Sequence, residues 1–576
     1  MASKVLGINY GGHDTSACLM INGQLKAACE QERYDYVKHS RNFPLEAIND
    51  CLKISKLKIS DVDIIAVGTN PTTIINERYL KKALFEKDRI NFLLNDFEKI
   101  KKLNNMENYI RKKLNYKKKI EFHSHHLCHL ASTYYPSGFK NSLLVSYDGT
   151  GEIDTGLFAF GKNGNIQVFQ NERNQYPNSL GLIYSAITFY LGWKHHCDEG
   201  IIMGLAPYGN PYAKIKKNKN SYIDIFRKII LYDKKKDGLK YTINPEWISY
   251  HQVRDKWVSD KFIKTFGPKT PYSKKVSMHK KNIAAALQLR LEEVVLAQLK
   301  ILKKKKKSDF LCISGGVGLN CSLNGKIRAS NLFKEIFVQP ASGDAGVAYG
   351  ACLVSTKNKL KKLHSVKRNN FYVGSRENKI SICKTLNKKR IKFKDFKDKI
   401  FEITADYLEK GKIVGWFQGA SEFGPRALGN RSILCKPFPK NMRDHLNKNV
   451  KFREEFRPFA PAVLEEDYKE YFDINQKSPH MLIACKVRKN KKDIIPAVVH
   501  VDDTCRVQTV NKGVNKEFWN LINQFKKRTT IPVLLNTSFN IKGQPIVNTS
   551  EDAINCFLKY KIDILVLGSI LIKKRN

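Results

Sequence analysis

One pattern that occurs twice constrains this chain more than any other feature. Residues 7–14 (GINYGGHD) end a strand-like run in a glycine turn, and a short apolar strand and an Asn-Gly turn at residues 22–23 follow. Residues 143–151 (LLVSYDGTG) do the same, with a strand at 157–160 and a second Asn-Gly turn at 163–164. Because Asn-Gly favours two-residue hairpins, each copy predicts a strand, a glycine turn, a strand, a hairpin and a strand.

Strand-like and amphipathic helical runs alternate through most of the sequence, which predicts an α/β fold. Duplicated hairpins that each present a glycine-rich turn resemble the two phosphate loops of the actin/hexokinase-like ATPase fold. The predicted strands are 5–8, 64–67, 143–147, 310–313 and 336–339, and the predicted helices are 45–54, 180–191, 283–302 and 345–356.

A second α/β pattern begins near residue 400, after a polar, lysine-rich stretch at 357–367 that we interpret as a linker. A chain of 576 residues is too long for one ordinary core. We therefore expect two domains, residues 1–360 and 361–576. The later elements are predicted helices 403–408 and 550–558 and predicted strands 413–417, 533–535 and 562–567.

Composition argues against several functional classes. The formal charge is +47, but the excess is mostly lysine in helix-like stretches such as 101–119 and 303–307, and no zinc-finger, basic-zipper or RNA-binding motif accompanies it. Such charge runs are usually solvated faces, so nucleic acid is not the expected partner. The 13 cysteines form no Cys-x-x-Cys pair, and the longest apolar stretches, such as 564–572, are too short for a membrane helix. With no apolar signal region at the N-terminus, we expect a cytoplasmic protein without a membrane segment.

A histidine-rich segment, residues 122–130 (FHSHHLCHL), is a candidate metal centre. His125 and His129 are spaced i, i+4 and share one face of a helix, although His126 with His129 is an alternative i, i+3 pair. Asp148 and Asp344 follow predicted strands, where α/β proteins build their sites. Two histidines and two aspartates suit Fe(II) or Mn(II) better than structural zinc. The other interpretation is a histidine-rich helix start that binds no metal.

Residues 313–320 (ISGGVGLN) form a glycine loop between a predicted strand and a helix-like segment. Backbone N–H groups in such a loop can approach a phosphate or nucleotide closely. The loop is not a Walker A sequence, since no Gly-Lys-Ser/Thr follows, and a tight structural turn is an equally good interpretation. Residues 203–209 (MGLAPYG) are another short turn that could line a nucleotide pocket.

Arginine is scarce, with 22 residues among the 101 Lys and Arg, yet five of them lie between Arg426 and Arg457. The switch from lysine to arginine indicates planar, bidentate binding of a small phosphate or carboxylate. The alternative is a surface network of salt bridges. Segments that add donors are 422–431 (EFGPRALGNR), 451–459 (KFREEFRPF), 500–506 (HVDDTCR) and 535–540 (LNTSFN).

These motifs together resemble the NodU/CmcH-type O-carbamoyltransferases almost from end to end. The family's blocks occur here in order: GxNxGGHD, HHxxHxAS, DGTGE, MGLAPYG, SGGVxLN, GDAG, EFGPRALGxRS, RExFRPFAP and NTSFN. The resemblance implies an N-terminal domain like that of the tRNA threonylcarbamoyladenosine transferases and a YrdC-like C-terminal domain. It further implies that carbamoyl phosphate and ATP form carbamoyl-adenylate in the C-terminal domain. The carbamoyl group then moves to an acceptor hydroxyl at the N-terminal metal site, and AMP leaves.

The resemblance also implies roles for particular residues. Fe²⁺ or another divalent metal would be bound by His125, His129, Asp148 and Asp344, and ATP, with Mg²⁺, would be a substrate. Nucleotide contacts would come from Gly12, His13, Lys38, Gly149, Thr150, Gly151, Gly315, Gly316, Val317 and Asn320. Carbamoyl phosphate would be bound by Arg426, Lys451, Arg457, Arg506, Asn536 and Ser538. His13, Lys451 and Arg457 are the expected catalytic residues, with His13 a candidate general base for the acceptor.

One position departs from the family pattern, because Ile201 stands where the family usually has lysine; Lys38 could supply the missing contact. Expected acceptors are hydroxyl-bearing small molecules or glycan precursors, among them antibiotics, sugar nucleotides and lipo-oligosaccharides. One alternative function is a tRNA-modifying enzyme of the threonylcarbamoyladenosine type, which would use the positive charge. Another is an ATP-dependent binding protein without transfer chemistry, which leaves the arginine cluster unexplained.

Overall fold

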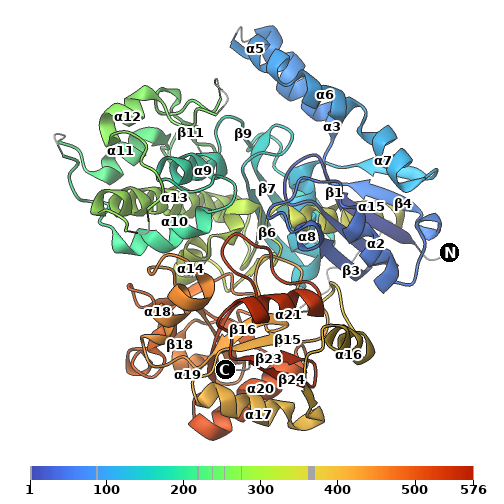
Figure 1. The fold of residues 1–576 in the computed structure, drawn as a ribbon. Helices are drawn as coiled ribbons and strands as arrows, with labels where there is room; N and C mark the ends of the chain where they lie inside the picture. Colours follow the sequence, from blue (N-terminus) through green and yellow to red (C-terminus); the bar gives the residue numbers. More distant parts are fainter. Residues whose placement is uncertain are drawn as a thin grey trace. The chain divides into compact units, whose positions relative to one another are not determined.

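The computed structural model describes residues 3–85, 88–216, 219–236, 238–251, 253, 255–273, 275–360 and 370–574. The chain forms two compact units (Figure 1). Unit 1 consists of Met1–Ala27 and Arg41–Arg368, and unit 2 consists of Ala28–Ser40 and Asn369–Asn576. The segment Ala28–Ser40 is thus built into the second unit although it lies near the start of the chain, an arrangement that no local sequence pattern predicted.

Unit 1 contains two sheets with the same topology. The first has the order β3-β2-β1-β4-β5, and the second contains the path β8-β7-β6-β12-β13. In each, the leading strand pairs antiparallel with the next strand and parallel with a later one. The repeat seen in the sequence is therefore a duplication of the sheet, which confirms the predicted duplicated ATPase-type fold. The strands are β1 (Lys4–Asn9), β2 (Ser16–Ile21), β3 (Gln24–Glu30), β4 (Ile64–Val67), β5 (Lys119–Phe122), β6 (Asn141–Tyr147), β7 (Asp154–Lys162), β8 (Asn165–Val168), β9 (Asn174–Gln175), β12 (Phe310–Ser314) and β13 (Glu335–Val338).

Two helices, α8 (His125–Ser137) and α15 (Ala345–Leu360), pack between the two sheets. Helix α15 packs on β1, β2 and β4, helix α8 packs on β6, β7 and β12, and the two helices pack on each other. Their close approach requires a glycine, because a Cβ at Gly350 would lie 2.0 Å from the carbonyl oxygen of Cys128. The N-termini of both helices carry candidate site residues, so this packing positions the site.

The rest of unit 1 is mostly helical. Helix α13 is the longest helix among the described residues and packs against α9, α10, α11 and α14. The helices are α2 (Leu45–Ile54), α3 (Pro71–Thr73), η2 (Ile74–Leu80), α4 (Lys81–Phe85), α5 (Asp88–Asn95), α6 (Phe97–Asn104), α7 (Met106–Leu114), α9 (Leu180–Tyr190), α10 (Glu199–Leu205), α11 (Tyr222–Ile229), α12 (Asp260–Phe266), α13 (Met278–Lys305) and α14 (Cys321–Ala329), and a small sheet joins β10 (Ile230–Leu231) and β11 (Thr242–Ile243).

Unit 2 is built on an eight-stranded sheet with the order β14-β24-β23-β15-β16-β22-β17-β21. Helices α17 (Ile400–Glu409) and α20 (Lys516–Thr529) pack on each other and on the sheet around a core that includes Trp416 and Phe525. The strands are β14 (Lys394–Asp395), β15 (Val414–Phe417), β16 (Arg431–Cys435), β17 (Ala460–Leu464), β21 (Gln508–Val510), β22 (Val533–Ser538), β23 (Ile564–Leu567) and β24 (Ile570–Lys573). Other elements are α1 (Glu32–Asp35), α16 (Lys379–Lys388), α18 (Met442–Leu446), η7 (Asn447–Lys451), α19 (Tyr468–Tyr471), α21 (Ser550–Lys559) and a sheet of β18 (Phe472–Asp473), β19 (Ala484–Val487) and β20 (Thr504–Arg506).

The predicted elements agree with these bounds to within a few residues, and α/β is the correct class. One prediction needs correction: residues 357–360, assigned to a linker, form the last turn of α15. Their lysines lie beyond the buried face of the helix, which ends at Thr356, and Lys357 and Lys359 suit the negative end of the helix dipole. Most of the remainder of the predicted linker, 361–367, lies outside the described residues. No helix among the described residues is long and apolar enough to cross a membrane.

Candidate active site

Four predicted metal ligands converge in unit 1 although they come from three separate segments of the chain. His125 and His129 lie on the first turns of α8, Asp148 follows β6, and Asp344 directly precedes α15. One ligand atom from each side chain lies within 4.8 Å of the others. All four residues are buried. The duplicated fold produces this meeting, because the end of β6 and the N-termini of α8 and α15 lie at one edge of the core.

The ligand atoms of this four-residue cluster lie close together, and only some of the distances between them fall within hydrogen-bond range. His125 Nε2 lies 3.3 Å from Asp148 Oδ2 and 3.5 Å from Asp344 Oδ1. His129 Nε2 lies 3.9 Å from Asp148 Oδ2 and 3.7 Å from Asp344 Oδ1. The two Nε2 atoms lie 3.1 Å apart and both point into the cluster. Within the described residues, buried Asp344 Oδ1 has no hydrogen-bond partner. Two imidazole nitrogens and two carboxylate oxygens that point at one position are a donor set that fits a divalent cation.

His126 is excluded from this cluster by its own hydrogen bonds. Its Nδ1 lies 2.9 Å from Ser146 Oγ, and its Nε2 lies 2.8 Å from the carbonyl oxygen of Asp154. Both ring nitrogens are therefore engaged with β6 and β7. Burial, followed by the charge of His125, lowers the pKa of His126 to about 3, so the ring stays neutral. Between the two spacings left open by the sequence, the geometry favours the i, i+4 pair.

His13 lies at the rim of the cluster, in the turn between β1 and β2. Its Nε2 lies 3.8 Å from Asp344 Oδ2, and its Nδ1 lies 2.9 Å from Asp14 Oδ2. Burial alone would lower its pKa, but the carboxylates of Asp344 and Asp14 raise the pKa of His13 to about 9. The side chain is 33% exposed, so it is the member of this group that an incoming molecule can reach.

The glycine loops assigned to the nucleotide surround Asp148. The backbone N–H of Gly316 donates to Asp148 Oδ1 at 2.7 Å, and a Cβ on Gly151 would lie 3.1 Å from the Cβ of His125. Gly315 has φ +86°, and a Cβ there would lie 2.1 Å from the carbonyl oxygen of Tyr147, so only glycine fits. A Cβ on Gly12 would lie 3.7 Å from Asp344 Oδ2.

The other predicted loop positions have structural partners of their own. Thr150 Oγ1 donates to the carbonyl of Gly151. Asn320 caps α14 by accepting from the N–H of Leu323 and exchanges hydrogen bonds with Gln288. Gly149 lies near Leu182, and Val317 is buried in η5 (Gly316–Leu319). Their nucleotide roles stay predictions.

Glu152, the last residue of the DGTGE block, lies at this site, although the sequence predicted no role for it. Its buried carboxylate accepts the backbone N–H of His125 at 3.0 and 3.2 Å and that of Asn70 at 2.9 Å. A carboxylate at a helix N-terminus is favoured by the helix dipole. Glu152 therefore fixes the first residue of α8, which carries a candidate ligand; the final Glu of the DGTGE block was the available signal.

The predicted carbamoyl phosphate residues all belong to unit 2 but come from separate elements. Lys451 ends η7, Arg506 ends β20, Asn536 and Ser538 lie on β22, and Arg426 precedes β16. The charges of Arg457 and Arg506 both lower the pKa of Arg453, and those of Arg453 and Arg457 both lower the pKa of Lys451. Lys451, Arg453, Arg457 and Arg506 therefore lie within electrostatic range of one another, and we call these four residues the cationic cluster.

Lys451 is fully engaged within the protein. Its buried Nζ donates to the carbonyl oxygens of Ser538 and Asn540 at 2.8 and 2.7 Å and to Asn540 Oδ1 at 2.8 Å. Burial, followed by the charge of Arg453, lowers the pKa of Lys451 well below its ordinary value. These bonds use all three ammonium donors, so Lys451 holds the loop after β22 in place; its predicted direct contact with phosphate stays a prediction.

The remaining predicted carbamoyl phosphate residues differ in how far protein groups engage them. Asn536 Nδ2 donates to the carbonyl of Ala427 and to Gln508 Oε1, whereas its buried Oδ1 has no hydrogen-bond partner within the described residues. Arg457 Nη1 lies 3.6 Å from the buried carboxylate of Glu454, a long ion pair. Arg457 and Arg506 are partly exposed.

Arg431 and Arg33, which also belong to unit 2, are engaged by neighbouring groups of the protein, as is Arg453 of the cluster. Arg431 is fully buried, donates to the carbonyls of Gln418 and Ser375, and lies over the ring of Phe417 at 3.7 Å. Arg453 and Arg33 likewise donate to neighbouring groups, Arg453 to Asn447 Oδ1 and the carbonyl of Pro458 and Arg33 to Glu30 and the carbonyl of Gly424. Arg33 thus holds the 424–426 loop from the N-terminal segment.

Two predictions concern the lysine missing from the first site. Ile201 lies on α10 and is buried, so its side chain packs in the interior of unit 1. Lys38 belongs to unit 2, where its charge contributes to lowering the pKa of Lys451. The structure therefore associates Lys38 with the cationic cluster, and its role in nucleotide binding stays a prediction.

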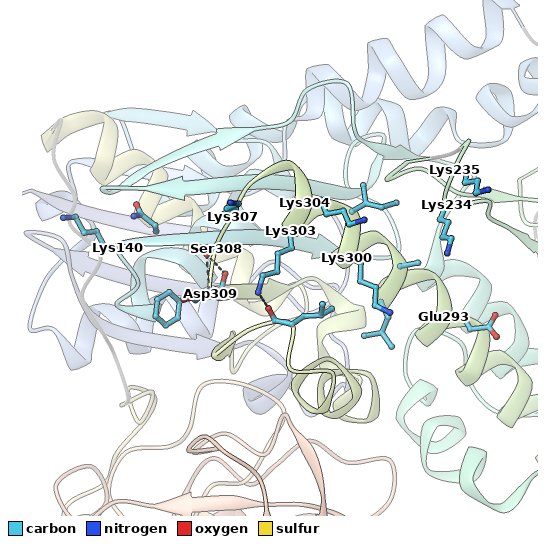
Figure 2. Close-up of a pocket in the computed structure, with 16 residues that line it drawn as sticks. Lys140, Lys234, Lys235, Glu293, Lys300, Lys303, Lys304, Lys307, Ser308 and Asp309 are labelled. Atoms are coloured by element: carbon cyan, nitrogen blue, oxygen red, sulfur yellow. Dashed lines mark hydrogen bonds between the residues drawn. The ribbon is translucent and has the colours of Figure 1, made fainter.

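A lysine-rich pocket of about 1440 Å³ lies along α13 (Figure 2). Figure 2 shows Lys300, Lys303 and Lys304 projecting from this helix, and Lys140, Lys234, Lys235 and Lys307 complete the basic lining. The two acidic lining residues are already paired: Glu293 with Arg227 and Arg290, and Asp309 with Lys334. The pocket shares no lining residue with either candidate site.

By its fold, the chain is a two-domain α/β protein with a duplicated ATPase-type core. The chain belongs to the carbamoyltransferase family: the family model for the carbamoyltransferase N-terminus matches residues 4–353, and that for the C-terminus matches residues 405–574. It is therefore a transferase enzyme.

Named relatives cover most of the chain. Nodulation protein NolNO of Sinorhizobium fredii is 36% identical over 98% of this chain and 79% of its own length. Nodulation protein NolO of Bradyrhizobium diazoefficiens is 38% identical over 78% of this chain and 79% of its own length. Among solved structures, component A of (R)-2-hydroxyglutaryl-CoA dehydratase from Acidaminococcus fermentans is 13% identical, with a TM-score of 0.33 over 62% of this chain and 99% of that one.

Proposed function

We propose that this carbamoyltransferase uses carbamoyl phosphate and ATP to form carbamoyl-adenylate and then transfers the carbamoyl group to an acceptor hydroxyl. Membership of the family supports carbamoyl transfer. The observation that carries the two-step scheme is the presence of two clusters of opposite character, one in each unit: buried carboxylates with histidines in unit 1 and crowded cations in unit 2.

The first step is assigned to the cationic cluster of unit 2. Release of both phosphate and pyrophosphate requires one water molecule: water cleaves carbamoyl phosphate to carbamate and phosphate, and a carbamate oxygen then attacks the α-phosphorus of ATP, expelling pyrophosphate. Arg457 and Arg506 supply charge where negative charge accumulates on the leaving phosphate. Lys451 holds the loop that carries Ser538 and Asn540, and Asn536 directs Oδ1 as an acceptor for the carbamoyl NH₂ group.

The second step is assigned to unit 1. The acceptor hydroxyl attacks the carbamoyl carbon, the bond to the adenylate oxygen breaks, and AMP leaves. We assign His13 as the group that accepts the hydroxyl proton, because it is the reachable group at the rim of the cluster and Asp14 orients its ring through Nδ1. Since its pKa is raised to about 9, the ring must first lose a proton; a divalent cation held by Asp344 would offset the carboxylate charge that raises this pKa. His125, His129, Asp148 and Asp344 would hold a divalent cation, for which we propose Fe²⁺. A cation bound there would act as a Lewis acid toward the carbamoyl carbonyl and offset the charge of the departing AMP.

The N-terminal ends of α8 and α15 both face this site, and their dipoles favour the negative charge of an adenylate. The N–H of Gly316 fixes Asp148, so the glycine loop positions a ligand carboxylate as well as providing space for a nucleotide. These contacts explain why glycine loops and candidate metal ligands occur together in one site.

The decisive experiment combines purified enzyme, labelled carbamoyl phosphate and ATP with a panel of alcohols. We expect pyrophosphate release in a single turnover and a carbamoyl mass increase on one class of alcohol. Pyrophosphate formation absent under all conditions would eliminate the adenylate route. Label found on adenosine of added tRNA instead of the alcohols would identify a tRNA-modifying enzyme.

A further inference from the structure

A pair of helical segments in unit 1, here called the helical arm, contributes no residue to either candidate site. It consists of η2 and α4, which run toward a tip, and α5 and α6, which return from it. The four helices pack on one another, and α6 also packs on α3 and α7 at the base of the arm. Figure 1 shows α5 and α6 projecting away from the sheets of unit 1. The tip itself, residues 86–87, lies outside the described residues.

The two sides of the helical arm are joined by contacts between their inner faces. Tyr79 and Leu103 are buried, and the Tyr79 hydroxyl donates to Asp96 Oδ2 at 2.5 Å, which links the outgoing helices to the returning ones. Nearer the base, the guanidinium of Arg78 lies 4.9 Å from the centre of the Tyr176 ring. These contacts fix the shape of the arm from its inner side.

The same helices expose five large apolar side chains to solvent. Leu80 and Leu84 are spaced i, i+4 on the outgoing helices and are 47% and 81% exposed. Ile90 and Leu94 have the same spacing on α5 and are 48% and 62% exposed, and Phe97, the first residue of α6, is 60% exposed. A surface helix normally carries polar residues on the face opposite its buried stripe. Apolar residues on both faces therefore indicate that something else covers the arm.

The exposed apolar surface is large enough for a specific contact. Side chains exposed to this extent present roughly 500 Å² in each copy of the chain, the size of patches that mark protein interaction sites. Two such surfaces packed together would bury roughly 1,000 Å², near the lower limit for a specific protein–protein interface. The area therefore suits a reversible contact between two arms.

The charges on the arm indicate which partner covers it. The whole chain has a formal charge of +47, but residues 77–98, which include all five exposed side chains, contain five acidic and five basic residues. Two strongly positive copies repel each other least where they meet through a segment without net charge. Under two-fold symmetry, an acidic residue of one arm can also lie near a basic residue of the other. An anionic membrane surface would instead favour a lysine-rich segment without acidic residues.

We propose that the helical arm binds the arm of a second copy of this chain, so that two helical hairpins form a four-helix bundle about a two-fold axis. The exposed leucines, Ile90 and Phe97 would form the apolar interior of that bundle. The proposal does not depend on the reaction, because the arm lies outside both candidate sites.

Sedimentation velocity of the full chain over a wide concentration range, without substrates, tests the proposal. We expect a dimer with a Kd on the order of micromolar, which should persist at high salt because apolar contacts are not screened. Leu84→Glu places a charge in the contact twice per dimer and should raise the Kd at least roughly thirtyfold. Leu94→Glu should do the same from the returning side of the arm. Thermal unfolding of the monomer should change little in either variant, since both side chains are mostly exposed.

Ile380→Glu on α16 of unit 2 is the matched control, since Ile380 is 80% exposed, as Leu84 is, but lies outside the arm. It should leave the Kd unchanged. A wild-type chain that stays monomeric at every concentration overturns the proposal, as does a dimer that both arm variants leave intact. If the glutamate variants do not fold, Leu84→Ser decides by the same measurement. A monomeric wild type that co-sediments with vesicles containing anionic phospholipid, and loses that binding in Leu84→Glu, would show that the arm contacts a membrane instead.

Discussion

The two candidate sites have opposite electrostatic character. In unit 1, burial would raise the pKa of Asp148, but the hydrogen bond from His125 and the charges of both histidines hold it well below its usual range. In unit 2, burial and neighbouring cations lower the pKa values of Lys451 and Arg453. Each site therefore places groups of like charge near one another: two buried carboxylates in unit 1, and in unit 2 buried Lys451 with the partly exposed Arg453, Arg457 and Arg506.

Crowding of like charges costs free energy unless a ligand of opposite charge relieves it. The carboxylates of unit 1 would be relieved by a cation, and the cations of unit 2 by a phosphate. The division of labour proposed above, in which unit 2 binds the phosphorylated donor and unit 1 carries out metal-assisted transfer, would relieve the crowding in both sites. The two sites cannot share one location, because the carboxylates of unit 1 would pair with the cations of unit 2 and neither group would then bind its ligand.

The largest expected effect is loss of transfer on substitution of a ligand in unit 1. His129→Ala should remove most of the bound metal and lower carbamoyl transfer by roughly a thousandfold. Single-turnover pyrophosphate release should remain substantial, because that step belongs to unit 2. Elemental analysis and quenched-flow product analysis measure the two quantities.

His126→Ala is the matched control for that variant, since it lies on the same helix and is buried. It should lower thermal stability through its lost bonds to Ser146 and Asp154 while leaving the metal stoichiometry unchanged. Metal loss in His126→Ala but not in His129→Ala would show that the i, i+3 pair is the ligand pair.

The second effect lies in unit 2. Arg457→Ala should reduce pyrophosphate release from ATP and carbamoyl phosphate by roughly 30- to 1,000-fold, as expected for a lost charged phosphate contact. Transfer should recover when carbamoyl-adenylate is supplied directly. Arg443→Ala, which removes an exposed ion pair with Asp444 in the same unit, should change little. Equal loss of the first half-reaction in Arg457→Ala and His129→Ala, both folded, would contradict the division of labour.

A smaller effect is expected from Glu152, which acts on the unit 1 site only through His125. Glu152→Gln should weaken metal affinity by roughly 10- to 100-fold, the usual consequence of losing a residue that orients a ligand. Competition with a metal-sensitive dye gives the affinity, and added metal should restore transfer. Glu107→Gln, an exposed carboxylate on α7, is the control. If saturating metal does not restore transfer in a folded Glu152→Gln enzyme, Glu152 does more than position His125.

The smallest effect is expected at the pocket along α13. The double variant Lys300→Ala/Lys304→Ala should leave carbamoyl transfer within roughly twofold of wild type, because solvated lysines away from a site contribute little. A filter-binding assay then compares the affinity of the double variant for tRNA with that of the wild-type protein. A strong, salt-sensitive loss of tRNA binding together with a loss of activity would instead support the tRNA-modifying alternative.

Local sequence predicted most of the helices and strands. It reduced the choice of histidine pair to two spacings, i, i+4 and i, i+3, but did not decide between them. The repeated strand–glycine–strand pattern predicted two equivalent sheets, because period-two alternation and Asn-Gly turns act over a few residues. The same locality explains why α2 was predicted at its observed bounds, Leu45–Ile54. It also explains why the density of arginines in the sequence did not separate Arg431 and Arg453, which donate to neighbouring protein groups, from the other arginines.

Only tertiary structure decided the remaining points. The choice between His126 and His125 depends on Ser146 and Asp154, which reach His126 from β6 and β7. The three donors of Lys451 are used by a loop that starts 87 residues further along the chain. The segment Ala28–Ser40 joins unit 2 through Arg33 and the carbonyl of Gly424, 391 residues away. A sequence pattern records what each residue prefers locally, whereas these partners are set by the long-range packing of sheets and helices, which no local pattern specifies.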